Sequence, residues 1–220
     1  MISFMDRDIR PKDIPVTLVL MGLNTVIFLI CSLKYPLTDP EVMIQLGGVY
    51  WPLILKGQWW RLFTAMFLHF GASHLASNLL VMFVLGSVVE KALGKLRYVA
   101  VYLLSGMGAG VVSFLYSMLS GGYIVSAGAS GALFGVMGAL VILAYAGMAG
   151  QYGIDTRRVP LMLVVSIAGG LYGNENIDLA GHIGGLVTGL IITFLMLILS
   201  KRKKDKSRDN KAAEGWHDQL

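Results

Sequence analysis

Six long apolar runs constrain the fold of this 220-residue chain more than any other feature. Hydrophobic residues make up 55% of the chain and charged residues only 14%, so there is too little polar surface to cover such runs in water. A helix of about 20 apolar residues spans a bilayer core of about 30 Å. The sequence therefore predicts an all-α, polytopic membrane protein with six transmembrane helices, of which the second and fifth are short, near residues 14–33, 75–89, 99–119, 130–149, 159–172 and 179–200.

The basic residues cluster in alternate connections between these runs, and this pattern predicts the orientation. Lys and Arg in short loops favour the cytoplasmic side. Both termini are then cytoplasmic, and the second, fourth and sixth helices all begin on the outer side. The clusters are Arg7, Arg10 and Lys12, then Lys91, Lys95 and Arg97, then Arg157 and Arg158, and finally the segment after residue 200.

Two polar segments complete the domain organisation. The connection 34–73 carries Trp51, Trp59 and Trp60, which indicates an interfacial loop because indole rings prefer the headgroup region. Residues 201–220 form a basic tail with seven Lys or Arg residues within 201–211. Directly after a membrane helix, such a tail is expected to be disordered, to lie in the cytoplasm and to attract anionic lipid rather than nucleic acid.

The compartment follows from what surrounds the first apolar run. Acidic and basic residues alternate before it, and no small-x-small cleavage site follows a short apolar core, so we expect a retained helix rather than a signal peptide. The single Cys31 excludes a disulfide framework within one chain. Without an organellar presequence or a soluble domain, the expected location is a prokaryotic cell membrane.

A serine surrounded by small residues opens the fourth run. Ser130 follows Gly128 and precedes Gly131, and glycines recur at Gly135 and Gly138. Small residues allow helices to approach closely in lipid, so packing alone is one interpretation. The other is a nucleophile with a bare backbone that lets a substrate come close, which requires a neighbouring base.

The sixth run supplies that base. His182, Gly185 and Gly189 fall on one helical face. If this glycine face packs against the one beginning at Ser130, the imidazole lies beside the hydroxyl at the outer end of both helices. A serine–histidine pair that takes and returns a proton is the predicted catalytic dyad.

Polar side chains at the start of the second run are candidates for stabilising an oxyanion. His74 and Asn78 are four residues apart and therefore share a helical face. With the backbone N–H of Ser130 they would supply donors to a developing negative charge. Glu175 and Asp178 lie before His182 at the membrane edge, and neither is assigned to orient the imidazole.

Two other kinds of site are disfavoured. The nucleophile elbow of soluble esterases needs Gly-x-Ser-x-Gly after a strand, and here Ala132 stands at the fifth position with no strand before it. A zinc site could use His69, His74 and His182, but no HExxH spacing or acidic or cysteine ligand accompanies them. We expect no metal and no cofactor.

Taken together, these motifs resemble a rhomboid intramembrane serine protease of the six-helix prokaryotic form. The matching pieces extend from about residue 45 to 195 and are Trp60-Arg61, His69, His74-x-x-x-Asn78, Glu90-Lys91-x-x-Gly94, Gly128-x-Ser130-Gly131-x-x-x-Gly135 and His182-x-x-Gly185-x-x-x-Gly189. The resemblance implies a Ser130–His182 dyad, with His74 and Asn78 supporting the oxyanion. It also implies a protein substrate whose transmembrane segment enters between the second and fifth helices and is cleaved near the outer leaflet.

Two positions depart from the pattern of that family. Phe134 stands where a tyrosine often stacks on the histidine, and Gly181 stands where alanine is common. Neither change removes a reacting group. The alternatives are a non-proteolytic rhomboid-like protein that binds membrane clients, and a small channel or transporter, which would be expected to show internal repeats and mid-membrane polar residues.

Overall fold

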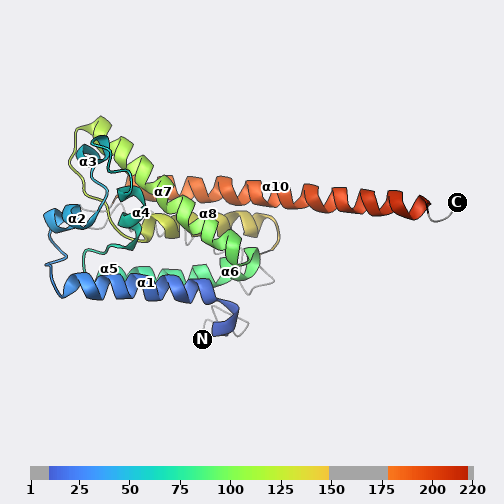
Figure 1. Cartoon of the computed structure of the whole chain (residues 1–220), viewed down its shortest axis with the longest axis horizontal. Helices are drawn as coiled ribbons and strands as arrows, with labels where there is room; N and C mark the ends of the chain where they lie inside the picture. Colours follow the sequence, from blue (N-terminus) through green and yellow to red (C-terminus); the bar gives the residue numbers. More distant parts are fainter. Residues whose placement is uncertain (1–9, 149–177, 218–220) are drawn as a thin grey trace.

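A computed structural model describes residues 10–148 and 178–217, and side chains as far as Arg202. Within these ranges every regular element is helical, and Val49 and Ser126 form one isolated antiparallel bridge. Figure 1 shows long helices side by side, with short helices gathered at one end. The elements are η1 Pro11–Asp13, α1 Pro15–Ser32, α2 Pro40–Leu46, α3 Trp51–Leu55, α4 Arg61–Thr64, η2 Ala65–Phe67, α5 Ala72–Val81, η3 Met82–Gly86, α6 Ser87–Leu93, α7 Lys95–Ser120, α8 Ser130–Tyr145 and α10 Leu179–His217.

In the described part of the chain, four helical segments are long and apolar enough to cross a membrane. They are Pro15–Ser32, Ala72–Leu93, Lys95–Ser120 and Leu179–Arg202. The fourth expected run forms α8, whose 16 apolar residues give a length of about 24 Å. The expected run 159–172 lies outside the described residues. The all-helical membrane architecture is therefore confirmed, and five of the expected runs have a helical counterpart.

The second spanning segment contains a π-helical turn. Met82–Gly86 (η3) joins α5 to α6 without a break. A π-turn adds a residue to the turn and so changes which face the following residues present. The side chains on either side are both buried: Asn78 before the turn and Glu90 after it.

Glu90 connects this segment to the first helix. Its carboxylate accepts hydrogen bonds from the backbone N–H groups of Val16 and Thr17, at 2.9 and 2.8 Å, and from the Thr17 hydroxyl at 2.8 Å. The first N–H groups of a helix have no intrahelical acceptor, so this buried carboxylate caps α1. The carboxylate at the end of the second spanning segment thus caps a different helix.

The glycine faces of α8 and α10 pack directly against each other. A Cβ added to Gly185 would clash with the carbonyl of Gly131, and one added to Gly189 would clash with the carbonyl of Gly135. Another face of α10 packs against α7. There, a Cβ added to Gly184 would lie 2.6 Å from Val112. Close backbone approach of this kind is what small residues permit, and it brings the first turns of α8 and α10 together.

The connection between α1 and α5 is folded around Arg61. This buried guanidinium donates to the backbone carbonyls of Ile44 and Gly48, at 2.6 and 3.0 Å, and to the side chain of Gln58 at 2.8 Å. Burial lowers the pKa of Arg61 below its usual value. The resulting loop, with α2, α3 and α4, covers the end of the bundle at which α5, α8 and α10 begin (Figure 1).

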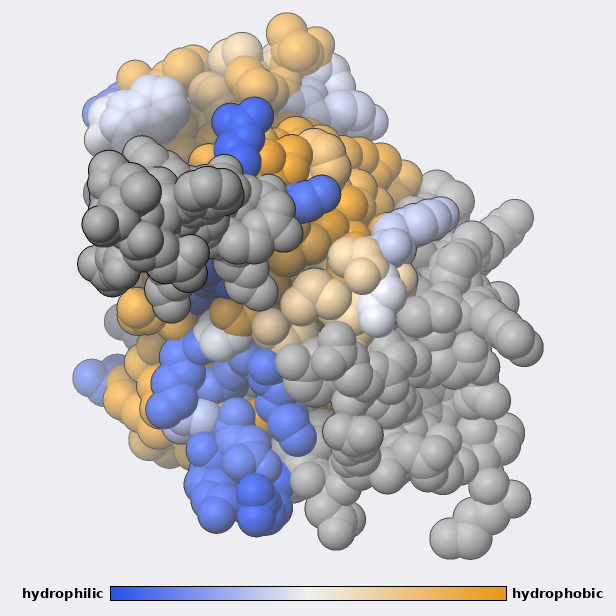
Figure 2. All heavy atoms as spheres, turned by 90° about the vertical axis from the view of Figure 1, so that its right-hand side faces the viewer, coloured by the Kyte–Doolittle hydropathy of each residue, from blue (hydrophilic) through white to orange (hydrophobic). Residues whose placement is uncertain are grey.

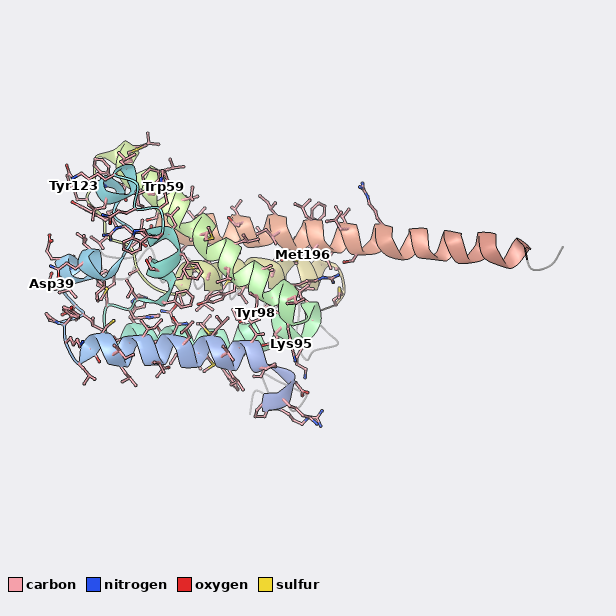
Figure 3. All side chains as sticks on the ribbon, viewed as in Figure 1. Asp39, Trp59, Lys95, Tyr98, Tyr123 and Met196 are labelled. Atoms are coloured by element: carbon pink, nitrogen blue, oxygen red, sulfur yellow. The ribbon has the colours of Figure 1, made fainter. Side chains whose placement is uncertain are left out.

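Two aromatic side chains lie at one end of the bundle, and a basic side chain lies at the other. Figure 3 places Trp59 and Tyr123 at one end and Lys95 at the other. On the end of the molecule from which α10 departs, hydrophilic side chains gather below hydrophobic ones (Figure 2). The placement of Trp59 and Tyr123 opposite Lys95 suits a protein whose two ends face different sides of a bilayer.

The last helix continues through the basic segment. It runs without interruption to His217, well beyond Ser200, where the apolar run ends. From its composition, the segment from residue 201 is expected to be disordered, whereas its backbone is helical as far as His217. The difference has a local reason, since Lys, Arg, Ala and Glu are all good helix formers.

Candidate active site

Ser130 is the first residue of α8, at the N-terminus of the helix, where the backbone N–H groups have no acceptor within the helix. The loop before it turns at Gly128, whose φ of +135° is rarely adopted by residues with a side chain. A Cβ at Gly128 would lie 2.8 Å from the His74 ring and 3.6 Å from Ser130 Oγ. Gly128 thus keeps open the space that the hydroxyl and this imidazole share.

His182 reaches Ser130 from the first turn of α10. Its Nε2 lies 2.9 Å from Ser130 Oγ, at hydrogen-bonding distance. Phe134, one turn after the serine, stacks on the imidazole with ring centroids 4.3 Å apart and planes 12° from parallel. The phenyl ring therefore provides a stacking surface at this position without a hydroxyl.

His74 and Asn78 border the same space from α5. Asn78 is buried, and its amide donates one N–H to the carbonyl of His74 at 2.8 Å. An amide carries two N–H donors, so the second is uncommitted by this bond. The structure thus brings the four polar residues singled out in the sequence to one site.

A buried histidine, His69, holds the loop that leads to Ser130. His69 is 1% exposed, and its Nε2 accepts from the N–H of Ala129 at 3.5 Å. Its ring packs edge-on against His74, with centroids 5.1 Å apart. Burial, reinforced by the neighbouring His74, lowers the pKa of His69 to about 3, so the ring is neutral at physiological pH.

Ser130, His182, His74 and Asn78 line one cavity of about 1050 Å³. Its walls come from α5, α7, α8 and the start of α10, from the connection between α1 and α5, and from the loop between α7 and α8. Gly128, Gly131 and Phe134 also line it, whereas Gly185 lies a turn further along α10 and serves the helix packing. A hydroxyl, an imidazole and several N–H donors around one cavity are the groups needed for acyl transfer.

Sequence reasoning missed two features that position the site. The bridge between Val49 and Ser126 ties the loop before the serine to the first connection, with N–H···O distances of 2.8 and 3.1 Å. Asp178 accepts from the N–H of Gly181 at 2.8 Å and lines the cavity. An Asp three residues before Gly181, at the start of an apolar helix, is a capping signal that could have identified the second.

A bundle of apolar helices with a cavity at one end is the architecture of a multi-pass integral membrane protein. The profile of the Rhomboid domain matches residues 56–199, which is well over half of the chain. The chain belongs to the rhomboid family.

Several characterised proteins are similar to this chain. The rhomboid protease GluP of Bacillus subtilis (strain 168) is 33% identical over 173 residues, covering 79% of this chain and 33% of GluP. The rhomboid protease AarA of Providencia stuartii is 32% identical over 209 residues, covering 84% of this chain and 74% of AarA. RHOMBOID-like protein 4 of Arabidopsis thaliana is 32% identical over 166 residues, covering 74% and 41% of the two chains. The chain thus spans only a third to two fifths of the length of GluP and RHOMBOID-like protein 4.

Proposed function

We propose that this protein is an intramembrane serine endopeptidase that hydrolyses peptide bonds in or next to the transmembrane segments of other membrane proteins. The observation that carries the proposal is the 2.9 Å approach of His182 Nε2 to Ser130 Oγ inside a cavity at one end of the bundle. Membership of a family that includes rhomboid proteases supports it.

The reaction begins with proton transfer from Ser130 to His182. As Ser130 Oγ attacks the carbonyl carbon of the scissile bond, Nε2 takes the hydroxyl proton. The tetrahedral intermediate then collapses, the C–N bond breaks, and the imidazolium gives its proton to the leaving amine. A water molecule, deprotonated by the same imidazole, attacks the acyl-enzyme and releases the carboxyl product and Ser130.

The negative charge that develops on the carbonyl oxygen needs fixed donors. The N–H of Ser130 at the start of α8, the His74 ring and the uncommitted N–H of Asn78 are the groups that we assign to it. His74 must be an N–H donor toward the cavity. Removing one such donor typically costs about 100- to 1000-fold in kcat.

The substrate and the location follow from where the site lies. The cavity opens among membrane-spanning helices at the end that also carries Trp59 and Tyr123 (Figure 3). We infer cleavage near the outer leaflet of a prokaryotic cell membrane, with a transmembrane segment as substrate and no metal or cofactor.

The test is cleavage of a reporter transmembrane protein by the purified enzyme in liposomes. We expect wild type to cut and both Ser130→Ala and His182→Ala to be inactive. Ser120→Ala is the matched control, because this exposed serine at the end of α7 lies outside the cavity. It should cut at the wild-type rate.

Two other outcomes would replace the proposal. Equal cleavage by wild type and Ser130→Ala would make Ser130 a packing residue. Binding of several reporters without cleavage of any would favour the client-binding function, which the relatives named only as rhomboid-like also allow.

A further inference from the structure

The carboxylate of Asp178 is tied to the backbone that carries the proposed base. Asp178 precedes α10, and its Oδ1 accepts from the N–H of Gly181 at 2.8 Å. Its main-chain carbonyl accepts from the N–H of His182 at 3.0 Å. Asp178 therefore accepts hydrogen bonds from the backbone of both Gly181 and His182, and these bonds fix the backbone position from which the imidazole extends.

Gly181 makes room for this carboxylate. A Cβ at Gly181 would lie 2.9 Å from Cγ of Asp178 and still closer to Oδ2. The carboxyl group thus occupies the volume that an alanine side chain would fill. Only Oδ1 takes part in the bond to Gly181, and Asp178 lines the same cavity as Ser130 and His182.

The imidazole of His182 has one nitrogen without a protein partner. Nε2 faces Ser130, whereas Nδ1 is buried and has no hydrogen-bond partner among the described residues. Among the described residues, the titratable groups that act on this ring are Asp178 at the start of α10 and His74 from α5. Phe134 of α8 covers one ring face. Asp178 is the one of these groups that carries a negative charge.

A negative charge four residues before this histidine, at the start of the same helix, favours the step that the dyad must perform. When His182 takes the proton of Ser130, the imidazole becomes positive in surroundings of low polarity. We propose that Asp178 is a positioning residue that stabilises the imidazolium form of His182 through its charge and fixes the first turn of α10 through its bond to Gly181. This inference rests on the proposed serine protease function.

Two substitutions of Asp178 distinguish the effect of its charge on His182 from the effect of its hydrogen bond to Gly181. Asp178→Asn keeps an oxygen that can accept from Gly181 but removes the charge. We expect kcat to fall about tenfold, with KM and the thermal midpoint unchanged. Asp178→Ala removes both, so kcat should fall at least as far and the midpoint should also fall.

A matched control uses the other aspartate that caps a helix. Asp39 Oδ1 accepts from the N–H of Glu41 at 2.9 Å at the start of α2, and Asp39 does not line the cavity. Asp39→Asn should leave kcat at the wild-type value. All variants are assayed for cleavage of the same reporter in the same liposomes.

The outcomes distinguish this inference from the function on which it rests. If Ser130→Ala is inactive and Asp178→Asn keeps wild-type kcat, only the role of Asp178 is wrong. A rise in KM alone, or a fall in kcat that follows the thermal midpoint, would also overturn it. If Ser130→Ala cuts like wild type, the proposed function itself fails.

Discussion

At the scale of single residues, the proposed mechanism depends on positions where adding or removing one atom would change the geometry of the candidate active site. Gly128 and His69 are two of them. Gly128 leaves space for an imidazole, and His69 stays neutral beneath the loop that leads to the serine. Each makes a prediction that does not depend on the other.

Gly128→Ala should nearly abolish cleavage without unfolding the protein. The added Cβ would meet the His74 ring at 2.8 Å, in a backbone conformation with φ of +135°. Displacing an oxyanion donor by this much should lower kcat by about 100-fold or more. Gly57→Ala is the control, since Gly57 also has a positive φ, of +93°, but has no atom within 4 Å of the added Cβ. Wild-type kcat in Gly128→Ala would contradict the assigned role of His74.

His69 should make the protein less stable in acid. Its pKa is about 3 in the folded protein because the ring is buried, against about 6.5 in an unfolded chain. Between these values only the unfolded state takes up the proton, so the free energy of unfolding falls as pH falls, by about 1.4 kcal/mol per pH unit. We expect the thermal midpoint to drop from about pH 7.5 to about pH 5 by less in His69→Gln than in wild type. Equal drops would show that His69 does not titrate in this way.

At the scale of helices, two connections hold the bundle together. One is the direct backbone contact between glycines of two helices, and the other is a buried carboxylate that binds a third helix. The glycine seam joins α8 to α10, and Glu90 joins α6 to the start of α1. Both connections are made within the apolar part of the protein, where an unsatisfied polar group or a steric clash is costly.

Gly189→Ala should destabilise the protein, whereas the same change at Gly22 should not. The Cβ at Gly189 would clash with the carbonyl of Gly135, which cannot move without separating the helices. Overpacking of this kind costs about 1–3 kcal/mol. Gly22, within α1, has nothing within 4 Å, and alanine there should gain up to about 1 kcal/mol in helix propensity. Thermal midpoints in detergent compare the two, and equal shifts would contradict the seam.

Glu90→Ala should detach the first helix from the bundle. The substitution leaves the half-buried N–H of Val16, the buried N–H of Thr17 and the Thr17 hydroxyl without an acceptor. We expect a loss of about 3 kcal/mol in stability. Thr17→Val alone should cost less, and the two changes together should cost less than their sum because they break a shared contact. Additive losses would mean that Glu90 acts elsewhere.

The elements also show what could be predicted from sequence. Hydrophobic length located α1, α7 and α8 to within a few residues, because burial in lipid imposes the same requirement on every spanning helix. It did not predict the π-turn at Met82–Gly86 or the bridge from Val49 to Ser126, which depend on contacts with distant segments. The proximity of Ser130 and His182 followed from two glycine patterns, whereas the contact between Asp178 and Gly181 was not identified.

At the scale of the whole molecule, charge and aromatic residues give the bundle a direction. Basic residues occur before α1, around the junction of α6 and α7, and along the end of α10. Figure 3 places one of them, Lys95, at the end of the bundle opposite Trp59 and Tyr123. The positive-inside tendency then predicts that both termini are cytoplasmic and that the cavity lies toward the outer leaflet.

Cysteine labelling tests this orientation in intact cells. In a Cys31→Ala background, the chain has no other cysteine. We expect Lys56→Cys, in the loop between α3 and α4, to react with a membrane-impermeant maleimide added outside. Ser207→Cys, in the last helix, should react only after permeabilisation. The reverse pattern would place the cavity on the cytoplasmic side.

The most direct test of the central claim is covalent labelling of Ser130 by a fluorophosphonate, followed by peptide mass spectrometry. This reagent reacts with serines whose hydroxyl is activated by a neighbouring base. We expect one modified serine, Ser130, in wild type, and no labelling in His182→Ala. Labelling of another serine, or equal labelling of Ser130 without His182, would contradict the dyad.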